Sequence, residues 1–197
     1  TSASRTSPVR LGPGLLALAQ RSRRDVMEIA HPLLKKLGME TGETIDLAIL
    51  RGDHVVFVDQ VIGAQRLRAV SAVGERFPLH STASGKACLA LLNDAEICSA
   101  VGEHFDNGDG AGLDAFLAEI AEVRRTGLAF DDEEHSVGIS AIGTAFRDST
   151  GDIYAISIPA PTARARMGRE RNAQLLLATR DELARLVGSP NPVAEAL

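Results

Sequence analysis

Apolar residues near the start of the chain recur at the spacing of one helix face, which predicts helices. The stripe begins over Leu11–Ala19 and resumes over Val26–Leu37, so two helices are expected after a polar first segment. Gly38 is expected to end the second helix as its C-cap. Pro32 predicts a kink or a new helical start within it.

From Glu43 onward apolar and polar residues alternate, as they do in strands that bury one face. Ile45–Ile49 and Val55–Val61 are two such runs, and the turn-forming segment 51–54 separates them. Together they predict a β-hairpin. A third strand is expected over Leu67–Val73, between two glycines.

The rest of the chain returns first to helical spacing, then to strands, and ends on a helix. The expected elements are helices over Ser84–Leu92, Asp94–Val101 and Leu113–Arg125, strands over Leu128–Phe130, Gly138–Phe146 and Ile153–Ile158, and a final helix over Arg169–Val187. Pro159 and Pro161 are expected to stop the last strand. This order predicts an α+β domain with a mainly antiparallel sheet.

Composition narrows the class of protein. A chain of 197 residues that is 45% hydrophobic is expected to form one domain. The formal net charge of −5 argues against a surface that binds nucleic acid, because phosphate binding needs clustered Lys and Arg. Cys88 and Cys98 form no disulfide framework or zinc motif, which favours the reducing cytoplasm. No apolar run approaches the roughly 20 residues of a membrane span.

The segment 76–87 is the first candidate site, because it is a loop that leads directly into a helix. Ser81 or Thr82 is expected to cap that helix, and the small residues 83–85 would let an anion approach its free N–H groups. The alternative is ordinary capping with close packing at Gly85. A phosphate-binding loop is excluded by His80 and Ala87, and a nucleophile elbow by the absence of glycine on both sides of Ser84.

The acidic run 131–134, followed by His135, is the second candidate. Such a run suggests general acid–base chemistry or a metal, but like charges in sequence are more typical of a solvated turn. We expect most of the run to be a turn, with Asp131 at its edge pointing inward as a polar anchor. The histidines lack the spacing of metal ligands, so no metal is expected.

Several short motifs, in order, resemble the effector domain of IclR-type transcriptional regulators. The resemblance covers residues 10–188 and rests on Leu11-Gly12, His31-Pro32, Gly42-Glu43-Thr44, Leu47-Ala48, the loop from Pro78-Leu79-His80 to Gly85-Lys86-Ala87, Arg125-Thr126-Gly127, and Phe130 to Glu134 with Gly138. Each motif is weak alone, and their common order and spacing carry the likeness.

The resemblance implies a domain with a GAF/PAS-like fold, in which helices flank a curved antiparallel sheet. It implies a linker segment and linker helix over 1–22, an effector-binding domain over 23–190 and a tail over 191–197. It also implies a winged helix-turn-helix that precedes this chain and alone contacts operator DNA, assembly into homodimers or homotetramers, no cofactor and no enzymatic activity.

The resemblance further implies a pocket for a small organic acid. The amides of Ala83 and Ser84 would hold its carboxylate, and Asp131 would contact its polar end. The other expected site residues are Gly85, Phe77, Leu67, Ala69, Ile139, Ala141 and Ser157. In the form of the family pocket that binds short keto acids, cysteine stands at the position of Ala141 and serine at that of Pro159. Their loss here favours an aromatic or longer apolar acid.

Two other classes of protein remain open from the residues alone. The first is a free-standing GAF-like sensor module that acts on a protein partner. The second is a small hydrolase that uses Ser84 or Asp131. Turnover that is lost on Ser84→Ala would favour the hydrolase, whereas binding without turnover would favour a sensor.

Overall fold

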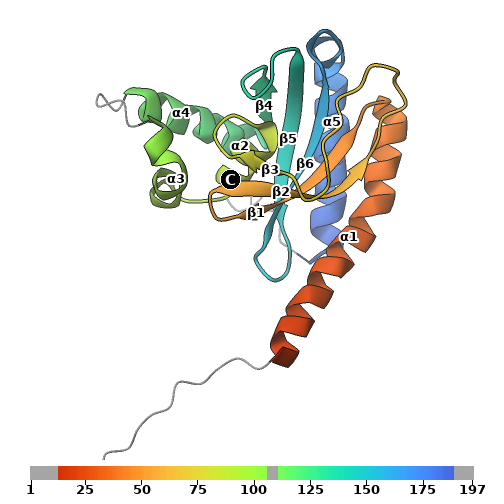
Figure 1. Cartoon of the computed structure of the whole chain (residues 1–197), viewed down its shortest axis with the longest axis vertical. Helices are drawn as coiled ribbons and strands as arrows, with labels where there is room; N and C mark the ends of the chain where they lie inside the picture. The colour runs from red at the N-terminus through yellow and green to blue at the C-terminus, as the bar shows by residue number, and fades with distance from the viewer. Residues whose placement is uncertain (1–12, 106–110, 189–197) are drawn as a thin grey trace, which may run out of the picture.

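The computed structural model describes residues 13–105 and 111–188, in which helices flank one sheet of six strands (Figure 1). In chain order the elements are α1 (Pro13–Thr41), β1 (Ile45–Arg51), β2 (His54–Val61), β3 (Arg76–Pro78), α2 (Ala83–Leu89), α3 (Asp94–Val101), the 3-10 helix η1 (Gly102–Phe105), α4 (Ala111–Thr126), β4 (Ala129–Asp132), β5 (Ile139–Arg147), β6 (Ile153–Pro161) and α5 (Thr162–Leu186).

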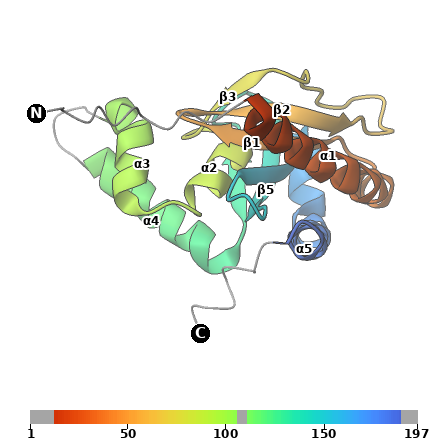
Figure 2. The same cartoon turned by 90° about the horizontal axis from the view of Figure 1, so that it is seen from below.

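The sheet has the strand order β3-β2-β1-β6-β5-β4, and every neighbouring pair is antiparallel. Helices α1 and α5 lie against one face, and α2, α3 and α4 lie against the other (Figures 1 and 2). The expected α+β class with a mainly antiparallel sheet is confirmed.

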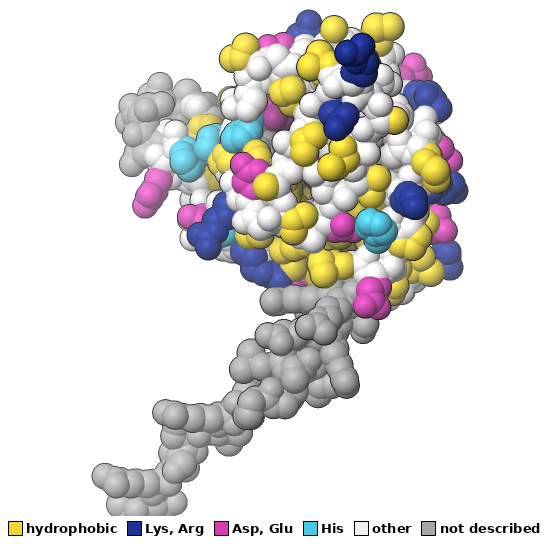
Figure 3. Space-filling model, turned by 45° about the vertical axis from the view of Figure 1, so that its right-hand side comes forward, with side chains coloured by type: hydrophobic (Ala, Val, Ile, Leu, Met, Phe, Trp, Pro, Cys, Tyr) yellow, Lys and Arg dark blue, Asp and Glu magenta, His cyan; other side chains and the backbone are white. Residues whose placement is uncertain are grey.

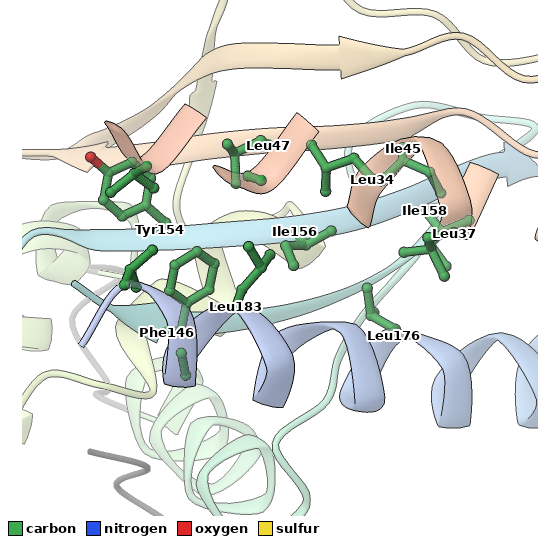
Figure 4. Close-up of a cluster of buried hydrophobic side chains, with 14 of the residues drawn as sticks. Leu34, Leu37, Ile45, Leu47, Phe146, Tyr154, Ile156, Ile158, Leu176 and Leu183 are labelled. Atoms are coloured by element: carbon green, nitrogen blue, oxygen red, sulfur yellow. The ribbon is translucent and has the colours of Figure 1, made fainter. Parts of the chain in front are cut away.

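Side chains that alternate along the strands build two cores. On the α1/α5 side, residues from both helices and three strands pack together, among them Leu34, Leu37, Ile45, Leu47, Phe146, Tyr154, Ile156, Ile158, Leu176 and Leu183 (Figure 4). On the opposite side, Ala48 and Ala155 face the helices α2, α3 and α4. Strand β6 is therefore buried on both faces, as expected of a central strand.

A β-bulge in the β1–β2 pair changes which residues of β2 face each side. The register shifts between Leu47, which pairs with Asp59, and Ala48, which pairs with Phe57. The bulge adds one residue, Val58, to β2, and the residues after it therefore point to the face opposite to the one that strict alternation would give. As a result Phe57 and Gln60 both lie on the α2 side, although they are three positions apart.

The helix boundaries differ from the sequence prediction at both ends of the chain. The two expected N-terminal helices are one, because α1 continues through Pro32 and past Gly38 to Thr41. Gly42 follows it at φ 74°, a conformation that favours glycine, and its amide bonds the Gly38 carbonyl oxygen. The proposed boundary at residue 22 falls inside this helix. Leu11 and the expected tail 191–197 lie outside the described residues.

Three other expectations were wrong. Residues 67–73 form no strand, and a short edge strand, β3, follows them instead. Strand β6 continues to Pro161. It tolerates Pro159 and Pro161 because both lie beyond its pairing with β1 and pair with β5 only, so one side of the strand needs no N–H donor there. Helix α5 begins at Thr162, seven residues before the predicted start at Arg169.

The irregular segment 62–75 is tied to the start of α5. Arg164 forms an ion pair with the buried carboxylate of Glu43, and the same guanidinium donates a 2.7 Å hydrogen bond to the Leu67 carbonyl oxygen. A bidentate Arg–carboxylate pair fixes orientation as well as distance. The segment is thereby held near the start of β1, and its residues 69–71 and 75 line the cavity described next.

Candidate effector site

A cavity of about 390 Å³ lies on the α2 side of the sheet. Its walls come from strands β1, β2, β3, β4, β5 and β6, from the start of α2, and from the segments 69–75 and 135–136. This volume is in the range of pockets that enclose small organic molecules.

Two rows of paired residues form the floor of the cavity. In the first row, Asp46 on β1 pairs with Ser157 on β6, and Ser157 pairs with Gly143 on β5. In the second row, Pro159 pairs with Ala141, and Ala141 pairs with Asp131 on β4. All of these except Gly143 line the cavity.

The start of α2 covers one end of the floor. Thr82 is the N-cap, as expected: its hydroxyl accepts a hydrogen bond from the Gly85 amide and donates one to the Pro78 carbonyl oxygen. The first amide bonded within the helix is that of Lys86, to the Thr82 carbonyl oxygen. The amides of Ala83 and Ser84 precede it, so the helix itself provides no acceptor for them.

Glycines allow α2 to approach so closely. A Cβ at Gly143 would lie 2.7 Å from the Ala83 carbonyl carbon, so the start of α2 rests directly on β5. A Cβ at Gly85 would lie 2.5 Å from the Leu79 backbone. Gly85 therefore serves close packing and does not line the cavity, which is the alternative that the sequence left open.

Ser84 is not arranged as a nucleophile. Its hydroxyl donates a 2.9 Å hydrogen bond to the hydroxyl oxygen of Ser157 rather than to a histidine, and both residues are buried. An activated serine needs an adjacent base. Cys88 offers no alternative, because burial raises the pKa of its thiol far above the ordinary value. These contacts support binding rather than covalent chemistry.

Asp131 points inward, as the sequence predicted, and it also organises the turn after β4. Its Oδ1 accepts hydrogen bonds from the amides of Glu134 and His135, at 2.9 and 3.3 Å. Burial raises its pKa above the ordinary value, against the effect of these two hydrogen bonds. The acidic run is a turn only in its second half, because Asp131 and Asp132 end strand β4 while Glu133 and Glu134 lie in the turn that follows.

Asp46 is a second buried carboxylate in the cavity, and sequence reasoning missed it. The residue is 1% exposed, and burial raises its pKa to about 6. Its Oδ1 accepts a 2.6 Å hydrogen bond from Gln60. Its alternation with Ile45 and Leu47, which face the other core, was the available signal: a charged residue between two buried apolar residues of a strand.

The cavity brings together all but two of the ten site residues expected from the sequence: Ala69, Phe77, Ala83, Ser84, Asp131, Ile139, Ala141 and Ser157. Gly85 does not line the cavity, because it packs against the Leu79 backbone. The Leu67 side chain is 69% exposed and does not line the cavity, because residues 67–73 are not a strand with an inward face.

Other classes of site receive no support within residues 13–105 and 111–188. No group of three or more His, Cys, Asp or Glu side chains there is arranged to hold a metal ion. None of the helices in this part of the chain combines the length and apolar character that crossing a bilayer requires. On the face shown in Figure 3, Lys and Arg side chains stand at separate places among hydrophobic and acidic ones.

Comparison with known proteins decides the family. Residues 19–185 match the family model described as "Bacterial transcriptional regulator IclR C-terminal". The chain belongs to the IclR family. It is 41% identical over 166 residues to the HTH-type transcriptional regulator Rv1719 of Mycobacterium tuberculosis, which covers 83% of this chain and 64% of that protein.

A second relative and a solved structure agree. The chain is 31% identical over 181 residues to the HTH-type transcriptional regulator TtgV of Pseudomonas putida, covering 91% of this chain and 70% of that protein. The crystal structure of the Thermotoga maritima IclR has a TM-score of 0.75 at 28% identity, over 90% of this chain and 75% of that chain. The chain thus spans about two thirds of the length of these curated relatives.

These matches confirm the resemblance noted in the sequence and the expected IclR-type fold. The IclR relatives named above are transcriptional regulators and not enzymes, which agrees with the expectation that this chain has no catalytic role. The chain is the C-terminal, effector-binding part of an IclR-family regulator.

Proposed function

We propose that the cavity between Ser84 and Asp131 binds the effector of a DNA-binding transcriptional regulator. The observation that carries the proposal is the cavity itself, whose buried polar groups, Ser84, Ser157, Asp46 and Asp131, converge among apolar walls. The lining combines these polar side chains with apolar ones such as Phe57, Phe77 and Ile139, and such a combination in a concave site is typical of small-molecule binding.

A small organic acid, aromatic or otherwise apolar, is the proposed class of effector. The amides of Ala83 and Ser84 and the hydroxyl of Ser157 are the proposed donors to its carboxylate. The rings of Phe57 and Phe77, stacked with centroids 4.6 Å apart, support an apolar or aromatic body. Ala141 and Pro159, both in the lining, place apolar side chains beside Asp131.

The effector is proposed to act through the sheet on α1. Asp46 lines the cavity, while the next residue, Leu47, packs in the opposite core together with Leu34 of α1. A shift of β1 on effector binding would therefore move Leu47 against Leu34 and displace α1. Coupling between two such sites is typically ~1–3 kcal/mol, and it requires only different affinities of the effector for two arrangements.

The whole regulator is proposed to repress or activate from an operator. A winged helix-turn-helix outside this chain would bind the DNA, as the names of its HTH-type relatives support. We propose residues 1–22 as the linker to it, 23–190 as the effector-binding domain and 191–197 as a tail. Homodimers or homotetramers in the cytoplasm, without a membrane partner or cofactor, complete the proposal.

A thermal-shift panel tests the effector proposal. Aromatic, keto and dicarboxylic acids would be added to the wild type and to two cavity variants, Asp131→Asn and Ala141→Phe. An acid present at 100 times its dissociation constant is expected to stabilise the wild type by about 2.7 kcal/mol. Asp131→Asn keeps an oxygen for the turn amides, and Ala141→Phe fills the cavity.

Both cavity variants are expected to lose the ligand-induced shift. Asp132→Asn is the matched control, because the Asp132 carboxylate faces Arg169 outside the cavity. It should bind like the wild type. A shift that survives both Asp131→Asn and Ala141→Phe would place the effector elsewhere and overturn the proposal.

A further inference from the structure

We infer that Asp46 receives a hydrogen-bond donor of the effector, so that the effector is an acid that also carries a hydroxyl or amino group remote from its carboxylate. The inference rests on the proposed function, because it names a second anchor in the same cavity.

The position of Asp46 in the sheet sets it apart from the carboxylate end. Gly143, over which the start of α2 rests, Ser157 and Asp46 stand side by side on three successive strands. Neighbouring strands lie about 4.8 Å apart, so Asp46 is about 10 Å from the strand beneath α2. An aromatic ring with groups at opposite ends suits that separation.

The hydrogen bonds of Asp46 leave acceptor capacity on the cavity side. An ionised carboxylate offers about four acceptor positions. Gln60 occupies one on Oδ1 at 2.6 Å, and the Ser71 hydroxyl approaches Oδ2 at 3.4 Å, a weak contact. A carboxylate that is 1% exposed requires further donors, and a bound ligand is positioned to provide one.

The charged side chains that line the cavity also favour an effector with a hydrogen-bond donor. Among the described lining residues, Asp46, Glu75 and Asp131 are acidic and His135 is the remaining ionisable side chain, while Lys and Arg are absent. An effector that offered only acceptors would meet carboxylates at one end without compensation. An effector with a donor forms a hydrogen bond with Asp46, and this bond offsets the free energy that the carboxylate loses when water is displaced from it.

Discrimination against the analogue that lacks the donor follows from this geometry. A hydrogen bond to a charged group contributes about 1.5–3 kcal/mol, which corresponds to roughly ten- to hundredfold in affinity. A ligand without the donor displaces water from Asp46 but forms no hydrogen bond in its place, so an acceptor position of the buried carboxylate is left unpaired.

Matched pairs of acids test the role of Asp46 by isothermal titration calorimetry. The probes are benzoate, 3- and 4-hydroxybenzoate and 4-aminobenzoate, with phenol and 4-methylphenol as uncharged probes. The proteins are the wild type, Asp46→Val, and Asp59→Val as the matched control. Asp59 lies on the neighbouring strand, but it bonds His31 on the α1 side. Circular dichroism melts would establish that each variant is folded.

The wild type and Asp59→Val are expected to bind at least one hydroxy or amino acid about tenfold or more tightly than benzoate. In Asp46→Val that preference should fall to about one, because benzoate affinity is retained while the donor's advantage is lost. Equal binding of benzoate and its derivatives by the wild type, or a preference that survives in Asp46→Val, would overturn the role of Asp46 and leave the organic-acid proposal standing.

Two further outcomes separate the inference from the proposed function. If phenol binds and depends on Asp46 while every acid fails, the role of Asp46 is supported and the organic-acid class is overturned. If no probe binds any of the three proteins, both are overturned for ligands of this size. An Asp46→Val variant that does not fold would be replaced by Asp46→Asn, in which the preference for a donor over its deoxy analogue should fall at least threefold.

Discussion

Lys86, fully buried in α2, donates a 2.7 Å hydrogen bond to Glu134 in the turn that follows β4. The same Nζ donates one of 2.6 Å to Glu119 of α4. The amide of Glu134 bonds Asp131, so one ammonium group ties the cavity wall to two helices. An ammonium taken out of water requires such partners, because burying it unpaired is costly.

The two carboxylates around Lys86 are predicted to substitute partly for each other. Either Glu119→Ala or Glu134→Ala leaves one ion pair and should cost below about 1 kcal/mol. The double variant leaves the ammonium buried without a partner and should cost about 3 kcal/mol, more than the sum of the single changes. Urea unfolding of the four proteins measures this coupling.

Glu122→Ala is the control for this double-mutant cycle. Its carboxylate pairs with Arg125 on the exposed face of α4, where solvent screens the pair. No measurable change in unfolding free energy is expected, alone or combined with Glu119→Ala. Simple additivity of Glu119→Ala and Glu134→Ala would contradict the shared role of Lys86.

Asp46 is predicted to make the folded state less stable as pH rises from about 4 to 6. Its folded pKa is raised from 3.8 to about 6, chiefly by burial, so the unfolded chain releases its proton first. The contribution is fully present below pH 3.8, is lost as pH rises towards 6, and is constant above that. The shift corresponds to a loss on the order of 3 kcal/mol.

Asp46→Asn tests this linkage, because asparagine keeps an acceptor for Gln60 and cannot ionise. Relative to the wild type, its unfolding free energy in urea should rise across pH 4 to 6 and then stay level. Asp131, whose pKa is also raised, contributes alike to both proteins. Asp53→Asn is the control: hydrogen bonding to His54 lowers the Asp53 pKa, so its variant should show no such rise. Parallel pH curves for Asp46→Asn and the wild type would contradict the prediction.

Gly85→Ala is predicted to destabilise the protein, although alanine is the better helix former. The added Cβ would lie 2.5 Å from the Leu79 Cα and carbonyl oxygen, and backbone cannot yield cheaply. Overpacking of this kind costs about 1–3 kcal/mol. Gly102→Ala is the matched control, since nothing lies within 4 Å of its Cβ and its φ is −56°. It should be neutral or gain about 0.5 kcal/mol. Thermal melts that rank the two variants in the opposite order would refute the packing role of Gly85.

The sequence predicted those features that local chemistry determines. The strands β1 and β2, the cap at Thr82 and the inward carboxylate at Asp131 depend on neighbouring residues and were confirmed, but the alternation along β2 holds only as far as the bulge after Phe57. The resemblance to the IclR family then brought together residues from separate elements, such as Ser84 on α2 and Ser157 on β6, which no local pattern could join.

The features that were missed depend on contacts between distant parts of the chain. Residues 67–73 have the composition of a strand, but the Leu67 carbonyl oxygen bonds Arg164 instead of a neighbouring strand. Pro161 remains in β6 because only β5 pairs with it there. Asp46 became a candidate only when the register placed it beside Ser157, on the cavity face.

A crystal structure with the tightest-binding acid of the thermal-shift panel tests the central claim most directly. We predict that the ligand lies in the cavity, with its carboxylate within hydrogen-bond distance of the Ala83 and Ser84 amides and its other polar group towards Asp46 or Asp131. A ligand bound elsewhere, for example in the open groove between Met27, His31 and Val58, with the cavity unchanged, would contradict it.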